Sequence, residues 1–256
     1  MEYKSFLQLI EAIAPLDQQA SWDRSGLLVS STKNDISKVG LALEPSLSTV
    51  IQAIDLGCDL LLTHHPLGLT PRFPAQKDNY FYVLQKLLQA DMFLYSAHTS
   101  LDVNVKGPVG WFARELELNH VQIIEEVSPG FGFGLIGDLS ELCTGKSFIA
   151  RLKTILNLDL LRCVGRIPAN IQRVGYCPGS GGELTKQAFA LGADVFITGD
   201  VKYHQAVEVE TLGLIVDVGH FVLEEKMMFD FYQLLTQQVK TIEFVFIQGK
   251  EPFFYL

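Results

Sequence analysis

The chain has 256 residues, of which 48% are hydrophobic, which is enough to bury the core of one large domain or two small ones. Its 20 basic and 29 acidic side chains give a formal net charge of -9, which argues against a basic nucleic-acid groove. No apolar run approaches the length that spans a bilayer. The four cysteines form no CxxC pair, so we predict reduced thiols in a cytoplasmic protein.

Short apolar runs alternate with helix-length amphipathic segments along the chain. Residues 1–16 predict an amphipathic helix rather than a signal peptide. The runs at 39–43, 59–63, 92–96, 195–198 and 214–218 predict strands, and the segments 46–57, 80–90, 183–192 and 222–238 predict helices. Several of the strands are apolar without alternation, which is typical of strands covered on both faces. This order predicts an α/β fold with mostly parallel strands.

An internal repeat organises the sequence. Residues 36–63 and 171–198 align without a gap, and nine of the 28 aligned positions are identical. Convergence on a common strand–helix–strand turn is the alternative, but gapless register over the whole unit favours duplication. We therefore predict two related α/β halves. The first covers 1–125 and is completed by about 220–256, and the second covers 126–219.

Four of the six histidines follow predicted strands: His64, His65, His98 and His220. His98 is followed by Asp102 and His220 by Glu224, so each half carries an H-x-x-x-acid segment after a strand. Ligands bind at such strand ends in open α/β sheets.

The spacing of these residues suits metal ligation. Side chains of adjacent residues in an extended segment point to opposite sides, so His64 and His65 can serve two ions, one each. In a helix, residues i and i+4 share a face, which brings imidazole and carboxylate together. Carboxylates also reduce the repulsion between two cations. Each motif alone is weak evidence, and either can occur by chance, but their joint occurrence in a repeated unit strengthens the metal interpretation.

At these residues the sequence resembles the Nif-three-like family of dinuclear-metal proteins, whose members are often described as GTP cyclohydrolase I type 2 homologues. The resembling motifs are WDRSGLLV (22–29), DLLLTHHPL (59–67), SAHTSLDVN (96–104), TGDVKYH (198–204), VGHFVLEE (218–225) and the C-terminal PFFYL (252–256). Together they span almost the whole chain. Two motifs depart from the family's usual pattern. The usual WDN-x-G is WDRSG here, and the usual HTNLD is HTSLD. Neither change replaces a ligand, and we expect Arg24 and Ser100 to alter substrate contacts instead.

The resemblance implies a ligand set for two divalent ions in a cleft between two α/β halves: His64, His65, Asp102, His220 and Glu224. It places His98 beside the metals, and it makes Asp200 and His204 line the same cleft. It also implies assembly into a toroidal homohexamer. The chain resembles the short bacterial members of the family, which have no inserted domain. Histidine and carboxylate ligands suit zinc, manganese, iron, cobalt or nickel.

Two functions follow from this interpretation. The first is a metal-dependent hydrolase, cyclohydrolase-like or phosphoesterase-like, in which a metal-bound hydroxide attacks a nucleotide or another small molecule. His98 or His204 would then transfer protons, because the reference pKa of histidine is close to neutral. The alternative is a non-enzymatic hexameric protein whose metals are structural or regulatory. Catalytic sites keep open coordination positions, and five or six ligands for two ions leave such positions, which favours catalysis.

Two glycine-rich segments have a structural and a functional interpretation. CPGSGGE (177–183) precedes a predicted helix and either forms a tight strand–helix turn or offers amides to a phosphate, although it lacks the GK[ST] of a P-loop. GFGFG (130–134) is expected to pack in a small sheet of the second half rather than to form a stacking platform.

Overall fold

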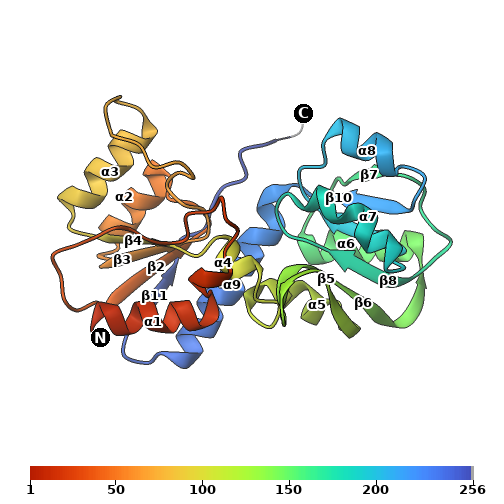
Figure 1. The fold of residues 1–256 in the computed structure, drawn as a ribbon, viewed down its shortest axis with the longest axis horizontal. Helices are drawn as coiled ribbons and strands as arrows, with labels where there is room; N and C mark the ends of the chain where they lie inside the picture. Colours follow the sequence, from red (N-terminus) through yellow and green to blue (C-terminus); the bar gives the residue numbers. More distant parts are fainter. Residues whose placement is uncertain (255–256) are drawn as a thin grey trace. The chain divides into compact units, whose positions relative to one another are not determined.

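The computed structural model describes residues 1–254 and divides into two compact units (Figure 1). Unit 1 comprises Met1–Pro108 and Met227–Leu256, and unit 2 comprises Val109–Lys226. The sequence placed the first division at 125/126, which falls inside strand β5 (Asn119–Ser128). Because β5 pairs along its length with β6, both strands belong to unit 2. Tyr255 and Leu256 of the PFFYL motif lie outside the described residues.

Unit 1 is built on a sheet with the strand order β1-β4-β3-β2-β11. Its strands are β1 (Gly26–Val29), β2 (Lys38–Ala42), β3 (Leu60–Thr63), β4 (Phe93–Ser96) and β11 (Glu243–Phe246). Its helices include α1 (Tyr3–Ile13), α2 (Leu47–Asp55), α3 (Asn79–Gln89) and α4 (Thr99–Asp102), with a short helix η1 (Leu16–Gln18). Helices α2 and α3 lie on one face of the sheet and α1 on the other (Figure 1).

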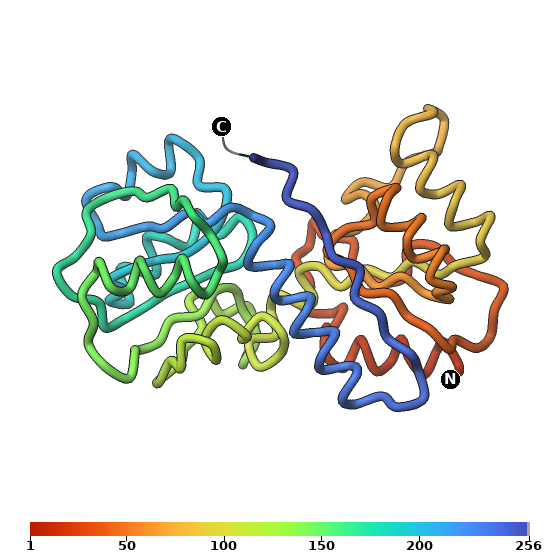
Figure 2. The backbone as a smooth tube through the Cα atoms, turned by 180° about the vertical axis from the view of Figure 1, so that it is seen from behind, coloured from red at the N-terminus to blue at the C-terminus, as the bar shows by residue number. Residues whose placement is uncertain are grey.

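The sheet of unit 1 is parallel apart from its edge strand β1, which runs antiparallel to β4. The last strand, β11, returns from the C-terminal end of the chain to pair with β2, as the blue segment beside the orange strands in Figure 2 shows. All four residues of β3 are buried, and so are those of β4. Burial on both faces explains why these strands are continuously apolar in the sequence.

Two helices of unit 1 begin at polar caps. The Ser46 hydroxyl accepts a hydrogen bond from Thr49 N at the start of α2, and the Asp78 carboxylate accepts one from Phe81 N at the start of α3. Val50 on α2 and Val83 on α3 are fully buried in one core cluster with Leu61 of β3. The caps fix where the two helices begin, and the buried apolar residues pack both helices against the sheet.

Unit 2 contains a sheet with the strand order β5-β6-β8-β9-β10-β7. Besides β5, its strands are β6 (Phe131–Thr144), β7 (Arg162–Val164), β8 (Asn170–Tyr176), β9 (Val195–Thr198) and β10 (Leu214–Asp217). Its helices include α5 (Trp111–Glu115), α6 (Gly145–Leu156), α7 (Thr185–Ala190) and α8 (Tyr203–Val209), with short helices η2 (Pro108–Gly110) at its start and η3 (Gly181–Leu184) before α7. Helix α9 (His220–Gln238) contributes its first residues to unit 2 and the remainder to unit 1.

Unit 2 differs from the predicted parallel pattern through a long β5–β6 hairpin. Only the β8–β9 and β9–β10 pairs are parallel, while β5–β6, β6–β8 and β10–β7 are antiparallel. Ser128 pairs with Phe131 across a two-residue turn in which Gly130 has φ +82°. The GFGFG segment thus starts β6, as the sheet interpretation expected. Gly132 has no room for a side chain, because an added Cβ would overlap Glu125 O.

The predicted duplication appears in the pairing of the strands. Val39 pairs with Leu60 across β2 and β3, and Val174 pairs with Val195 across β8 and β9. Both pairs are parallel, and the second lies 135 residues after the first (174 − 39 and 195 − 60). The strand–helix–strand order predicted for both segments is confirmed, with η3 and α7 in the place of α2.

The correspondence continues beyond the segments that the sequence aligned. In each unit the order is helix, two strands, helix, strand, helix, strand, helix: α1-β1-β2-α2-β3-α3-β4-α4 and α6-β7-β8-α7-β9-α8-β10-α9. An antiparallel edge strand flanks each sheet, β1 beside β4 and β7 beside β10. The repeated unit therefore contains four strands in each half, and β11 in one unit and β5–β6 in the other are additions to it.

Register shows that the two H-x-x-x-acid segments are not equivalent. Leu60 pairs with Phe93 and Val195 with Leu214, so β10 follows β4 by 121 residues (214 − 93). At this offset His98 corresponds to a glycine, residue 219, and the counterpart of His220 is residue 99. The sequence treated the two segments as matching, but the sheets displace them by one residue. The difference between the offsets (135 − 121) means that unit 1 has 14 more residues between β3 and β4 than unit 2 has between β9 and β10.

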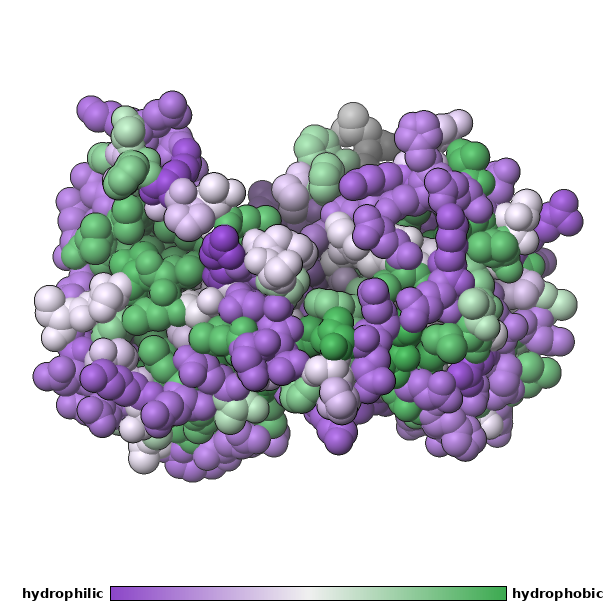
Figure 3. All heavy atoms as spheres, in the orientation of Figure 1, coloured by the Kyte–Doolittle hydropathy of each residue, from purple (hydrophilic) through white to green (hydrophobic). Residues whose placement is uncertain are grey.

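Hydrophobic residues reach the surface of both units on the face seen in Figure 3. In the part of the chain that the structure describes, no helix is long and apolar enough to cross a membrane. Among the exposed large side chains, Trp22 in unit 1 is 57% exposed although it lies next in sequence to the buried Asp23.

Candidate metal centre

His64 and His65 follow β3 at a bend in the chain. The backbone of this bend is held on both sides: Thr63 Oγ1 donates to His65 O at 2.8 Å, and Ser96 Oγ of β4 donates to His64 O at 2.7 Å. Thr63, Ser96 and His64 are fully buried. Because the strand has ended, side-chain alternation no longer applies, and the two histidine rings lie 5.1 Å apart between centroids.

Three histidines gather in unit 1. The His98 ring lies 5.1 Å from that of His64 and 5.7 Å from that of His65. One nitrogen from each of the three lies within 4.8 Å of the others, which is a spacing that can hold a metal ion. Asp102 lies beside them, with its Oδ1 atom 3.7 Å from His64 Nε2. The structure thus brings together the predicted residues of the first half.

Ring orientation at His64 and His98 is set by hydrogen bonds at Nδ1. His64 Nδ1 lies 2.9 Å from Ala97 O, and because a carbonyl only accepts, this nitrogen carries the proton. His98 Nδ1 lies 2.8 Å from Asp23 Oδ1. Burial raises the pKa of Asp23, but hydrogen bonds from His98 and Thr99 outweigh it and hold that pKa well below its usual range. Asp23 therefore stands as a carboxylate in contact with His98.

In unit 2, His220 begins α9 and Glu224 follows one turn later. His220 Nε2 lies 2.9 Å from Glu224 Oε2, so imidazole and carboxylate converge on one helix face as the spacing predicts. Glu224 is only 4% exposed. Its hydrogen bond to His220 is the main reason that the pKa of His220 rises to about 9 against the effect of burial, and Asp200 adds to the rise.

Asp200 lies against the other nitrogen of His220. Its Oδ2 atom is 2.7 Å from His220 Nδ1 and accepts a hydrogen bond from Ser180 Oγ. Asp200 has φ +53°, an uncommon conformation outside glycine. Its place in the repeat is that of His65 (200 − 65 = 135), so equivalent positions carry a histidine in one unit and a carboxylate in the other.

A buried carboxylate that the sequence analysis missed organises the same loop. Asp217 at the end of β10 is 5% exposed and accepts hydrogen bonds from Val201 N, Gly219 N and the Arg162 side chain. Asp217 therefore ties the segment that carries Asp200 to the start of α9. Its signal in the sequence was a charged residue inside an otherwise apolar strand, LIVDV.

His204 stands apart from these groups in unit 2. It is exposed on α8, and its ring lies 5.4 Å from that of Tyr203. The structure thus does not bring His204 to His220 in the way that it brings Asp200.

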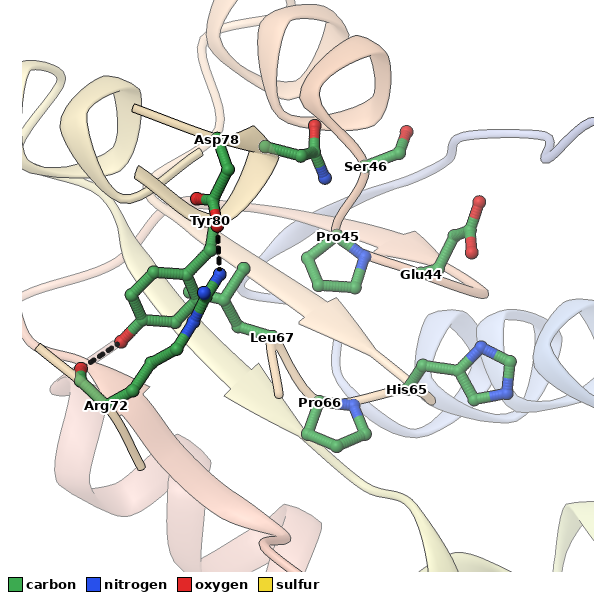
Figure 4. A pocket seen from close by; sticks show the side chains of 10 residues that line it. Glu44, Pro45, Ser46, His65, Pro66, Leu67, Arg72, Asp78 and Tyr80 are labelled. Carbon is green, nitrogen blue, oxygen red and sulfur yellow. Dashed lines mark hydrogen bonds and ion pairs between the residues drawn. The ribbon is translucent and has the colours of Figure 1, made fainter. Parts of the chain in front are cut away.

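A cavity of ≈ 440 Å³ opens in unit 1 beside His65 (Figure 4). It lies at the carboxyl ends of β2 and β3, where open α/β sheets bind ligands. Arg72 lines it, pairs with Asp78 at 2.8 Å and lies 4.4 Å from the centroid of the Tyr80 ring. Arg72, Asp78 and Tyr80 lie between β3 and β4, the interval in which unit 1 is longer than unit 2.

The glycine-rich CPGSGGE segment forms a tight turn in unit 2. Gly179 has φ +61°, and Gly181 N donates to Thr198 Oγ1 at 2.9 Å. An added Cβ at Gly181 would lie 2.7 Å from the same Oγ1 atom. The backbone at this turn is thus engaged within the protein, which favours the structural interpretation over a phosphate site.

The fold and the site define the chain as a two-unit α/β protein with candidate metal sites. Histidines and carboxylates follow the strands of the repeated unit, in groups that can hold a metal ion. The family model described as Duf34/NIF3 (NGG1p interacting factor 3) matches residues 1–252. The chain belongs to this family, as its motifs suggested.

Relatives cover the whole chain. The GTP cyclohydrolase 1 type 2 homolog of Clostridium perfringens is 30% identical over 263 residues, covering 100% of both sequences. A solved hypothetical protein from Staphylococcus aureus is similar with a TM-score of 0.90 and 26% identity, covering 100% of this chain and 99% of that chain. Reduced HcgD from Methanocaldococcus jannaschii is similar with a TM-score of 0.85 and 27% identity, covering 97% and 98%.

Proposed function

We propose that the protein binds two divalent metal ions and acts as a metal-dependent hydrolase in the cytoplasm. The proposed ligands are His64, His65, Asp102, His220 and Glu224. The observation that carries the proposal is the gathering of His64, His65 and His98, with one nitrogen of each within 4.8 Å of the others.

The donor set fits divalent ions. All five residues offer imidazole nitrogen or carboxylate oxygen, which suits zinc, manganese, iron, cobalt or nickel. His64 is fully buried with Nδ1 held by Ala97 O, so its Nε2 atom is the one available to a metal. In unit 2, the buried Glu224 and His220 hold each other in one orientation at 2.9 Å. When bound, such ions supply Lewis acidity and activation of water.

The protein's own residues contribute positioning and proton transfer. His98 adjoins His64 and His65, and its Nε2 atom is suited to accept a proton from a reacting group. Asp200 orients His220 through Nδ1. The exposed position of His204 gives no comparable support for a role in proton transfer.

Catalysis is favoured over a purely structural centre by the space beside His65. A cavity of ≈ 440 Å³ is within the size range of small-molecule sites. Its lining includes a guanidinium stacked on an aromatic ring, which suits a small polar substrate such as a nucleotide. The name of the Clostridium perfringens relative agrees with a cyclohydrolase-like reaction.

The test is a screen of the purified protein, loaded separately with each candidate metal, against nucleotides, phosphodiesters and cyclic amides. Turnover that requires metal and disappears in His65→Ala supports the hydrolase. His120→Ala is the matched control, because this histidine is exposed on β5 and is hydrogen-bonded to Asp138 rather than placed among the proposed ligands. Stable metal binding without turnover of any substrate class would favour the alternative, a non-enzymatic metal-binding or regulatory protein.

A further inference from the structure

We infer that Asp23 is a positioning residue that holds the Nδ1–H of His98 and so presents His98 Nε2 toward His64 and His65. The part of the inference that concerns metal rests on the proposed function. The part that concerns the His98 ring does not, because it is a property of the protein without metal.

The Asp23 carboxylate is built into unit 1 as an acceptor. It is 2% exposed and lies just before β1, 75 residues from His98 in sequence. Besides the His98 contact it accepts four hydrogen bonds, from Arg24 N, Ser25 Oγ, Thr99 N and Thr99 Oγ1. The two backbone amides among these can only donate, so both carboxylate oxygens act as acceptors.

This arrangement fixes which nitrogen of His98 carries the proton. A neutral imidazole has one N–H and one lone pair. With Nδ1 donating to Asp23 Oδ1 at 2.8 Å, the lone pair is on Nε2. The His98 ring lies 5.1 Å from His64 and 5.7 Å from His65, so Nε2 is the atom that it offers to the group.

The backbone of His98 is held by the same segment. His98 N donates to Ser25 Oγ at 3.1 Å, and this hydroxyl in turn donates to Asp23 Oδ2. Residues 23–25 thus hold both the backbone position of His98 and the orientation of its ring. Unit 2 shows the same arrangement at a different position, where Asp200 holds Nδ1 of His220 at 2.7 Å.

A purely structural role for Asp23 is the competing explanation, because its carboxylate also accepts from Thr99 N at the start of α4. That role predicts lost stability in Asp23→Asn but no particular state of the His98 ring. Asp59→Asn is the matched control. Asp59 also accepts two backbone N–H bonds in unit 1, from Ser37 and Lys38, but it touches no histidine in the described residues.

The experiment is long-range ¹H–¹⁵N correlation of histidine side chains in the metal-free protein at a pH where His98 is neutral, with the His98 signal assigned by His98→Gln. We expect wild type and Asp59→Asn to show the proton on Nδ1, and Asp23→Asn to show a mixture or the proton on Nε2. A proton on Nε2 in wild type would overturn the inference, whether or not Asp23→Asn folds. An unchanged ring state in folded Asp23→Asn would overturn it as well.

Metal affinity provides the second readout. Zinc titration should show weaker binding for Asp23→Asn and no such change for Asp59→Asn, because one nitrogen of His98 belongs to the group of three that lie within 4.8 Å of one another. Unweakened zinc binding by folded Asp23→Asn would also contradict the positioning role. If wild type binds no metal at all, the proposed function fails, and the ring measurement still decides the role of Asp23.

Discussion

Asp59 and Asp194 lie 135 residues apart and make the same pair of hydrogen bonds, one in each unit. Asp59 Oδ2 accepts from the backbone N–H groups of residues 37 and 38 at the start of β2. Asp194 Oδ2 accepts from those of residues 172 and 173 in β8, both at 2.8 Å. Asp59 thus ties the turn before β3 to the beginning of β2, and Asp194 ties the turn before β9 to the beginning of β8. The identity seen in the sequence at these positions has this physical reason.

This equivalence predicts matched losses of stability. Asp59→Asn and Asp194→Asn should each lower the free energy of unfolding by about 1–2 kcal/mol, because an amide cannot accept from both N–H groups as strongly as a carboxylate. Urea unfolding followed by circular dichroism measures the change. Asp55→Asn, on the exposed side of α2, is the control and should stay close to wild type. An effect at only one of the two positions would contradict equivalence.

The contribution of Asp59 should depend on pH. Burial raises its pKa, but hydrogen bonds from Lys33, Ser37 and Lys38 outweigh this and lower the pKa to about 2 from 3.8. Because the folded-state pKa lies below the unfolded value, the stabilisation is complete above about pH 4 and is lost as the pH falls toward 2. The difference in stability between wild type and Asp59→Asn should therefore be constant from pH 5 to 7 and shrink below pH 4. A difference that grows on acidification would refute this assignment.

The features that the sequence predicted are those recorded in local patterns. The strands LLLT and FLYS are apolar because both of their faces are buried, and the repeat is visible because both turns need the same glycine and aspartate. The β5–β6 hairpin was missed because its strand β5 is largely exposed and carries no clear alternation. Asp23 was missed as a functional residue because its contact with His98 spans 75 residues, which no periodic signal reports.

Metal content should reach two divalent ions per chain in fully loaded protein, and Glu224→Gln should lower it. Glutamine keeps the size of the side chain but removes the charge that neutralises a cation. The apolar strands do not depend on this carboxylate, so circular dichroism should change little. Elemental analysis of both proteins decides the matter, with Glu208→Gln as a control at the surface pair with Lys186. A saturated count of one ion in wild type would refute the dinuclear proposal.

Assembly into a homohexamer is the fourth prediction, and it rests on the family resemblance. Light scattering at micromolar concentration should give a mass close to six times 28.5 kDa. The 48% hydrophobic composition is compatible with buried interfaces but does not select six copies. A monodisperse monomer would refute the prediction, whereas another closed oligomer would correct its number.

Gly179→Ala should impair the metal group of unit 2 more than it impairs folding. Gly179 has φ +61°, and a Cβ at this position would overlap Glu224 Oε1 and lie 3.5 Å from His220 Cε1. The clash would push the Glu224 carboxylate away from His220. Placing alanine in a left-handed conformation costs about 1–2 kcal/mol of stability.

Gly57→Ala separates these two effects. Gly57 has φ +73°, but an added Cβ there meets no atom within 4 Å, so this variant carries the backbone strain without the clash. Both variants should lose similar stability in urea unfolding, whereas only Gly179→Ala should bind less zinc or manganese by titration calorimetry. Equal metal binding by the two variants would mean that the position of the Glu224 carboxylate does not matter for the ions, and it would remove Glu224 from the proposed ligand set.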